Sequence, residues 1–348
     1  MIPFRPPRVE RCQTLTFRQR TISRRHFSAA LLAGMTVPHS QPAFGQALDG
    51  IRHTIRGMGQ LHSLLIQRGD EVIFAEAPRG PGLDRVANIK SCSKSIVALL
   101  LGTTITRSEI KSVNATLHDV APRLIPPKAA QGVAAITMED LVTLRAGLES
   151  TSRANYGSWV KSSNWVAYAL SRPMVDVPGG HMIYSTGSSH VLGAAIATAT
   201  GKSLLALVRE RLGAPLGIEV SAWRRDPQGF YFGGNEMTLT PRAMLRLAVM
   251  MRDKGRFGGT QVIAPGWIDA SLTRRTVSPF SGLAYGYGWF LSDSGFAIAR
   301  GYGGQIIAAH PARKLAVVIT SDPGQPALSE GYFGQLMALL EGPVLALG

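Results

Sequence analysis

Apolar positions follow two different patterns along the chain, with short strand-like runs near both ends and helical stretches between them. Leu64–Ala75 surrounds an Arg-Gly-Asp turn and predicts a β-hairpin. Near the other end, β-branched and aromatic runs separated by turn residues predict strands at 285–291, 295–299, 306–310 and 315–321, followed by a closing helix at 331–340. We therefore expect one sheet built from both ends of the chain.

The middle of the chain is predicted to be mainly helical. The segment from Ser93 has no helix breaker before Gly102 and predicts a largely buried helix. Thr137 and Asp140 have capping-box spacing at the start of a helix that we expect to stop before Gly147. Further helices are expected over 191–200, 204–212 and 243–251. The predicted fold class is α+β, with an antiparallel sheet flanked by helices over 48–115 and 256–348 and an inserted mainly helical subdomain over 116–255.

The first 47 residues have the organisation of an export signal. They hold seven arginines and one acid, and the pair Arg24-Arg25 precedes Phe27 and a short apolar stretch over 29–37. Small residues near Ala47 end the segment, so it resembles a twin-arginine signal peptide. The apolar stretch is too short for a membrane span of about 20 residues. We expect a periplasmic or secreted protein; the alternative is a disordered basic arm.

Removing this segment changes the meaning of the net charge. The whole chain of 348 residues carries +15, but 30 basic and 21 acidic residues remain after residue 47, a net charge of about +9. These charges form no block, so we expect no nucleic-acid partner. No later apolar run is long enough for stable membrane insertion. One cysteine, Cys92, remains, which excludes an internal disulfide.

Ser91 and Lys94 are the first candidate catalytic residues. A serine hydroxyl is a poor nucleophile until a neighbouring base takes its proton. A spacing of three along a helix places both side chains on one face, and burial would lower the pKa of the lysine towards a value useful for proton transfer. A Ser-x-x-Lys pattern also arises by chance, so this pair needs support from the rest of the chain.

Two later segments could complete such a site. Tyr184 follows a turn and precedes a helix, where a tyrosine can relay a proton. The glycine cluster around Tyr302 precedes a strand and could offer the backbone N–H of Gln305 to an oxyanion. The alternatives are a packed tyrosine and a glycine turn. Tyr156 and Trp165 are expected to line a pocket. The histidines show no metal-ligand spacing, and we expect no metal or organic cofactor.

In this order and spacing, the three segments resemble the motifs of the serine β-lactamase and penicillin-binding-protein superfamily, over about residues 60–345. The likeness is closer to the class C β-lactamase-like branch, with its family VIII esterases and nylon-oligomer hydrolases. It implies a β-lactamase/transpeptidase-like fold in which Ser91 is the nucleophile and Lys94 and Tyr184 share the work of general base. Oxyanion donors would be the backbone N–H groups of Ser91 and Gln305, and the expected substrate-binding residues are Tyr302, Gly303, Gly304, Ser185, Tyr156 and Trp165.

Two departures from the family pattern point to the substrate. Thr186 stands where β-lactamases usually carry asparagine, and Tyr302 stands where a lysine would grip a β-lactam carboxylate. Both changes favour an exported esterase or amidase, acting on a small-molecule substrate, over an efficient β-lactamase. The alternatives are a D-alanyl-D-alanine carboxypeptidase or weak β-lactamase of the same fold and, in another class, a non-catalytic periplasmic binding or sensor protein.

Overall fold

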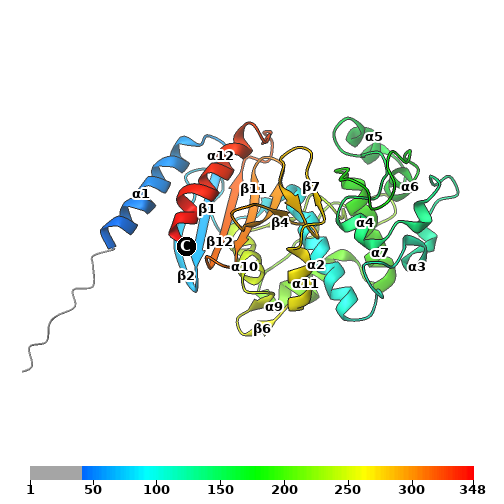
Figure 1. Cartoon of the computed structure of the whole chain (residues 1–348), viewed down its shortest axis with the longest axis horizontal. Coiled ribbons are helices and arrows are strands. Elements are labelled where there is room, and N and C mark those ends of the chain that lie inside the picture. Colours follow the sequence, from blue (N-terminus) through cyan, green and yellow to red (C-terminus); the bar gives the residue numbers. More distant parts are fainter. Residues whose placement is uncertain (1–40) are drawn as a thin grey trace, which may run out of the picture. The chain divides into compact units, whose positions relative to one another are not determined.

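One antiparallel sheet organises the protein, whose computed structural model describes residues 41–348. The order of its strands is β2-β1-β12-β11-β10-β9-β8-β7, so the N-terminal hairpin lies beside the C-terminal strands (Figure 1). The prediction of one sheet built from both ends of the chain is confirmed. The strands are β1 (Leu61–Arg68), β2 (Glu71–Glu76), β7 (Thr276–Val277), β8 (Ala284–Tyr285), β9 (Phe290–Leu291), β10 (Ala297–Gly301), β11 (Gln305–His310) and β12 (Leu315–Ser321).

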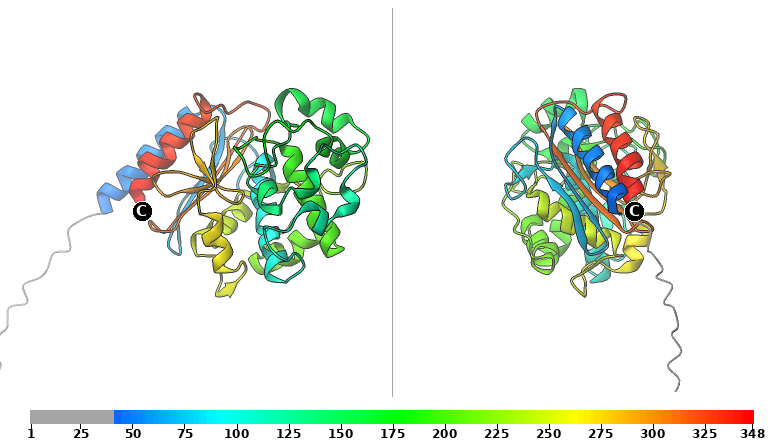
Figure 2. Two further views of the ribbon diagram at one scale, coloured as in Figure 1. Left: turned by 45° about the vertical axis from the view of Figure 1, so that its right-hand side comes forward. Right: turned by 90° about the vertical axis from the view of Figure 1, so that its left-hand side faces the viewer.

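Helices cover both faces of this sheet. Figure 2 shows α1 (Gln41–Gly57) and α12 (Tyr332–Leu339) side by side across one face, where Ile51 and Ile55 are fully buried. α10 (Pro241–Arg252) packs on the other face against β11 and β12. Since successive side chains of a strand point to opposite faces, a sheet covered on both sides needs apolar residues at nearly every position. β11 and β12 are accordingly buried along their whole length.

The helical region centres on α2 (Ser93–Thr106) and α7 (Thr186–Thr200), which pack against each other. A short antiparallel pair, β3 (Ala87–Asn88) with β4 (Thr238–Leu239), brings the chain around 238 next to the segment that leads into α2. A second short pair consists of β5 (Arg256–Phe257) and β6 (Thr260–Gln261). The remaining helices are α3 (Leu117–Val120), α4 (Met138–Val142), α5 (Tyr156–Lys161), α6 (Trp165–Leu170), α8 (Leu204–Val208), α9 (Ala214–Leu216) and α11 (Pro265–Ser271).

The capping box predicted from the sequence is present at α4. Thr137 accepts a hydrogen bond from the Asp140 amide, and the Asp140 carboxylate accepts one from the Thr137 amide. The helix ends at Val142, earlier than the expected stop before Gly147. Leu144 has φ +60°, in the left-handed region, so the chain has already left the helix there.

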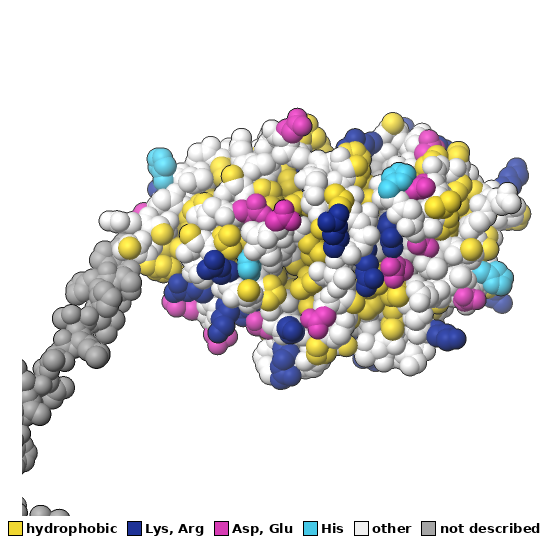
Figure 3. Space-filling model, viewed as in Figure 1, with side chains coloured by type: hydrophobic (Ala, Val, Ile, Leu, Met, Phe, Trp, Pro, Cys, Tyr) yellow, Lys and Arg dark blue, Asp and Glu magenta, His cyan; other side chains and the backbone are white. Residues whose placement is uncertain are grey.

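The element boundaries differ from the predicted ones at several places. The strand predicted at 285–291 is two short strands, β8 and β9, and α7 begins at Thr186, before the predicted start at 191. Residues 41–47, which fall within the predicted export segment, lie in α1; the rest of that segment lies outside the described residues. α10 falls within the predicted helical subdomain but packs on the sheet. Among residues 41–348, no single helix is long and apolar enough to cross a membrane, and α7 with the helix that follows passes only as a pair bent by 80°. On the face seen in Figure 3, acidic and basic side chains are interspersed.

Candidate active site

Ser91 lies in a tight turn, η1 (Lys90–Cys92), immediately before α2. Lys90 has φ +50°, a conformation that costs energy in a residue with a side chain and needs support from its surroundings. The Ser93 hydroxyl donates to the Lys90 carbonyl at 2.6 Å and accepts from the Met237 amide at 3.3 Å. The Lys90 ammonium also pairs with Glu236 at 3.2 Å. These contacts hold Ser91 immediately before the helix.

Lys94 directs its amine at Ser91 from one turn further along α2. Lys94 Nζ lies 3.1 Å from Ser91 Oγ, 3.3 Å from Thr186 Oγ1 and 2.8 Å from the Gly234 carbonyl oxygen. The lysine side chain is buried, and burial lowers its pKa, an effect that the neighbouring Tyr184 opposes. A lowered pKa favours the neutral amine, the form that can accept a proton from the Ser91 hydroxyl.

Tyr184 is brought to the same place by the chain that enters α7. Its ring centroid lies 5.0 Å from Lys94 Nζ, and the Ser150 hydroxyl donates to its carbonyl oxygen at 2.7 Å. Tyr285 is fully buried close by, and burial raises the pKa of its phenol. The structure therefore brings together the three residues that the sequence assigns to catalysis: Ser91, Lys94 and Tyr184.

The half-buried guanidinium of Arg300 is a further charged group near Tyr184. Arg300 stacks on the Phe333 ring at 3.4 Å and donates to the Ala327 carbonyl at 2.8 Å. Burial lowers the pKa of Arg300 to about 10, and Tyr184 raises it. This arginine remains charged at neutral pH and links β10 to the segment before α12.

The third motif lies against the nucleophile turn. The Cys92 thiol donates to the Gln305 carbonyl at 3.5 Å, which places the start of β11 beside the residue that follows Ser91. A Cβ atom on Gly301 would come within 2.3 Å of the Ile89 carbonyl oxygen, so only glycine permits this close approach. The backbones of Ser91 and Gln305, the predicted oxyanion donors, thus belong to adjacent segments.

The other glycines of this motif serve the hairpin between β10 and β11. Gly303 and Gly304 both have positive φ, and a Cβ atom on Gly304 would come within 2.7 Å of the Tyr332 ring. The space over this glycine is therefore filled by protein. Tyr302, between these glycines and β10, is about half exposed.

The structure corrects two of the predicted substrate-binding residues. Ser185 is buried, and its hydroxyl accepts from the Thr151 amide at 3.2 Å, so it fastens one loop to another. Trp165 is buried in an aromatic cluster, with its ring centroid 5.4 Å from that of Trp159 and 4.9 Å from that of Phe232. Both side chains serve the core, where nothing exposes them to a substrate.

Tyr156 is closer to the reacting groups. Its hydroxyl accepts a hydrogen bond from the Asn235 side-chain amide at 3.1 Å. Asn235 follows Gly234, whose carbonyl oxygen contacts Lys94. Tyr156 is half-buried at this place, so a role in lining the substrate site stays a prediction.

Three contacts of the site escaped the sequence analysis. Thr186, noted there only as a departure from asparagine, supplies a hydroxyl to Lys94. Ser152 supports it, because its hydroxyl accepts from the Thr186 amide at 2.9 Å and lies 3.0 Å from the Thr186 hydroxyl. Gly234 acts through its backbone. Its place in the pair Gly233-Gly234 is the one signal in the sequence that could have drawn attention to it.

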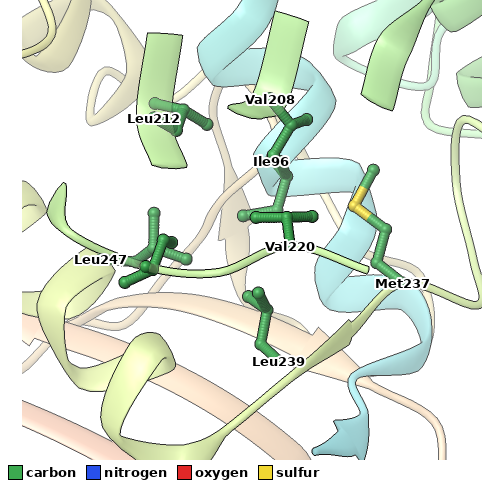
Figure 4. A pocket seen from close by; sticks show the side chains of 8 residues that line it. Ile96, Val208, Leu212, Val220, Met237, Leu239 and Leu247 are labelled. Carbon is green, nitrogen blue, oxygen red and sulfur yellow. The ribbon is translucent and has the colours of Figure 1, made fainter. Parts of the chain in front are cut away.

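Two cavities in the described part of the chain lie apart from this arrangement. One has a volume of about 310 Å³ and is lined by residues at and after the end of α7 and in the 228–231 loop, among them Ala197, Gly201, Lys202, Gln228 and Tyr231. The other, an apolar cavity of about 10 Å³, lies behind α2 (Figure 4) and is too small for a substrate. Within residues 41–348, no group of three or more metal-ligating side chains is close enough to hold a metal ion. The apolar cavity is lined by Ile96, Val208, Leu212, Ile218, Val220, Met237, Leu239 and Leu247.

This fold, with the three motifs in place, defines a hydrolase of the serine β-lactamase and penicillin-binding-protein superfamily. Residues 49–332 match the family described as Beta-lactamase, and the chain belongs to this family. The resemblance inferred from the sequence is therefore confirmed, and so is the predicted β-lactamase/transpeptidase-like fold.

Solved structures of several hydrolases share the fold. One, from Bacillus anthracis and described as a 6-aminohexanoate-dimer hydrolase, has a TM-score of 0.72 and 15% identity over 85% of this chain and 80% of its own. EstCE1, a hydrolase with promiscuous acyltransferase activity, has a TM-score of 0.70 and 17% identity over 87% and 99%. A family VIII carboxylesterase has a TM-score of 0.67 and 17% identity over 86% and 96%. No curated protein matches the chain by sequence.

Proposed function

We propose that this protein is an exported serine hydrolase that cleaves ester or amide bonds, cyclic amides included, through an acyl-Ser91 intermediate. The observation that carries the proposal is the 3.1 Å contact between Lys94 Nζ and Ser91 Oγ, made by a buried amine whose pKa is lowered by burial. Burying an amine is costly, and buried groups with shifted pKa values cluster at functional sites, which supports a catalytic role for Lys94.

The arrangement supports a two-stage reaction. Ser91 Oγ attacks the carbonyl carbon while its proton passes to Lys94, with Tyr184 sharing the transfer and protonating the leaving alcohol or amine. Backbone N–H groups of Ser91 and Gln305 would stabilise the negative oxygen of the tetrahedral intermediate. A water molecule then attacks the acyl carbon and gives a proton to the same Tyr184 and Lys94 pair. The bond between the acyl carbon and Ser91 Oγ breaks, the pair returns the proton to Ser91, and the acid is released.

Features at the third motif support esters and neutral amides over β-lactams. Tyr302 is half exposed where a β-lactamase would offer a cation to the substrate carboxylate. Among the structures of similar fold, one is a carboxylesterase and another is described as a 6-aminohexanoate-dimer hydrolase. The partner that we propose is therefore a small molecule with an ester or amide bond.

Replacing the nucleophile tests the proposal directly. We expect Ser91→Ala to abolish hydrolysis of a short p-nitrophenyl ester and labelling by a fluorophosphonate, with no change in Tm. Ser221→Ala, the same change at an exposed loop serine, is the matched control and should keep full activity. Undiminished hydrolysis by Ser91→Ala would contradict the proposal.

A substrate panel separates this proposal from its alternatives. Turnover of nitrocefin faster than of esters and amides would favour a weak β-lactamase, and release of D-alanine from a peptidoglycan peptide would favour a carboxypeptidase. A wild-type protein that neither hydrolyses the panel nor reacts with the fluorophosphonate would instead be a binding or sensor protein.

Export of the chain is proposed from its first 47 residues. The support is the arginine pair at Arg24 and Arg25, followed by an apolar stretch and small residues. We propose a periplasmic or secreted location for the mature hydrolase.

A further inference from the structure

A histidine and an aspartate form a fully buried pair next to the catalytic region. His190 Nε2 lies 2.9 Å from Asp226 Oδ2, and neither side chain has any solvent exposure. The histidine belongs to α7 and is surrounded by the rings of Trp159, Trp165 and Phe232. Burying such a pair is costly unless each polar atom has a partner. The mechanism above makes no use of it.

The partners of this pair fix where its hydrogens lie. Asp226 Oδ1 accepts from the amides of Gln228 and Phe230 at 2.9 and 2.8 Å. His190 Nδ1 accepts from the Gly233 amide at 3.3 Å. Because Nδ1 faces a donor, it carries no hydrogen, so the neutral ring donates to Asp226 through Nε2.

The histidine thereby holds a segment that reaches Lys94. Gly233 is fastened to His190 through its amide, and the next residue, Gly234, accepts the hydrogen bond from Lys94 at 2.8 Å. The path from Asp226 to the amine therefore consists of His190 and the two residues Gly233 and Gly234.

Close packing makes this path stiff. A Cβ atom on Gly233 would lie 2.6 Å from the Ser189 carbonyl oxygen, and one on Gly234 would lie 2.9 Å from the Ser189 Cβ. The two glycines are thus pressed against α7 with no room for a side chain. We therefore expect a shift of Gly233 away from His190 to move Gly234 as well.

We infer that His190 and Asp226 are positioning residues for the reaction: through the Gly233 amide they set the place of the Gly234 carbonyl and with it that of the Lys94 amine. The inference rests on the proposed function for its kinetic consequence, but the positioning itself is a property of the fold. Neither side chain touches the substrate.

The substitution Asp226→Asn replaces one hydrogen-bond acceptor by a donor while keeping the volume of the side chain. The two backbone amides at Gln228 and Phe230 hold the remaining oxygen, so the new NH₂ group faces His190 Nε2. The ring must then move its hydrogen to Nδ1, which brings two N–H groups together at Gly233. We expect this conflict to push Gly233 and Gly234 away and kcat to fall about 10- to 100-fold, the loss that a displacement of about 1 Å produces.

Trp165→Phe is the control for a merely structural effect. It loosens the same aromatic cluster and removes no hydrogen bond, because Trp165 Nε1 has no partner in the protein. If the pair positions Lys94, Asp226→Asn should lower kcat far more than Trp165→Phe does, and the KM of Asp226→Asn should change less than twofold. Both variants are measured at a temperature well below their Tm values. Equal losses in the two variants, or unchanged kcat in Asp226→Asn, would overturn the inference.

Crystal structures of wild type and Asp226→Asn decide the positioning independently of hydrolysis. We expect the separation between Gly234 O and Lys94 Nζ to lengthen in the variant; an unchanged separation refutes the inference even if activity falls. An inactive wild type would refute the proposed function alone, since the separation would still report on the positioning.

Discussion

At the scale of single residues, the chemistry depends on how the protein surrounds one amine. Lys94 has lost water and gained three acceptors: a hydroxyl from the nucleophile, a hydroxyl from Thr186 and the carbonyl of Gly234. These acceptors satisfy the ammonium, whereas burial favours the neutral amine. The balance between hydrogen bonding and burial therefore determines the fraction of Lys94 that is neutral, and able to act as a base, at a given pH.

This balance predicts the pH dependence of the reaction. Burial lowers the pKa of Lys94, so the amine loses its proton at a lower pH than a free lysine, whose pKa is about 10.4. We expect kcat/KM for the p-nitrophenyl ester to rise with pH through one limb below that value, since this quantity reports the free enzyme. Lys94→Arg, charged at every accessible pH, should be inactive throughout. A limb that survives in Lys94→Arg would assign it to another group.

Site residues that lie close together in the sequence were easier to predict than those that lie far apart. Ser91 and Lys94 were predictable because one helix turn relates them. Thr186 and Gly234 reach the same amine from two separate segments, and Ser152 supports Thr186 from a third. Gly234 acts through a backbone oxygen that a sequence motif does not encode. The prediction that Trp165 lines a pocket was wrong for a similar reason. Whether an aromatic residue near a loop lies in a pocket or in the core depends on the packing of α6 and α7, which the local sequence does not show.

At the scale of elements, the site depends on the contact between β10 and the turn that carries Ser91. This contact joins an element from the end of the chain to one from its first third, and Gly301 permits it. Elements with local signals, such as the β1–β2 hairpin and the capped α4, were predictable because hydrophobic periodicity and turn residues suffice for them. The contact between β10 and η1 has no such signal, since it depends on the register of the whole sheet.

Adding one methyl group at this contact should separate the two elements. We expect Gly301→Ala to cost about 1–3 kcal/mol of stability through overpacking against the Ile89 carbonyl. It should also lower kcat/KM about tenfold or more, by moving the β10–β11 hairpin away from Ser91. Chemical denaturation and ester kinetics measure the two effects.

Gly266→Ala provides the control for this prediction. Gly266 lies in α11, and nothing lies within 4 Å of an added Cβ atom there. The same change should leave activity unaltered and stability equal or higher by up to about 1 kcal/mol. Wild-type kinetics in Gly301→Ala would show that the close approach is not needed for catalysis.

At the scale of the whole molecule, the first helix lies across the boundary of the predicted export segment. α1 begins at Gln41, whereas that segment extends to Ala47. A cut near Ala47 would leave Ile51 and Ile55, the fully buried residues of α1, in place. Cleavage of the signal is therefore compatible with the packing of α1 on the sheet. The helix itself was not predicted from the sequence, because its first residues overlap the small residues of the signal.

The export proposal predicts a location that can be measured by cell fractionation. We expect Arg24→Lys combined with Arg25→Lys to keep the full-length chain in the cytoplasm, because a twin-arginine signal requires that pair. Arg18→Lys combined with Arg20→Lys changes the same number of arginines and should still be exported. The retained protein should be active, since it needs no disulfide. Normal export of the first double variant would contradict this type of signal.

Cys92 gives the nucleophile turn a built-in reporter of local opening. Its thiol is fully buried against the start of β11, and burial raises its pKa, so it is protonated and shielded from reagents while the turn is closed. In a mature chain that has lost Cys12, a thiol reagent can reach Cys92 only after an opening that exposes it, and separation of β11 from the nucleophile turn is one such opening. The rate at which Ellman's reagent reacts with Cys92 therefore measures how often the structure around the nucleophile turn opens. The measurement needs neither a mutation nor a substrate.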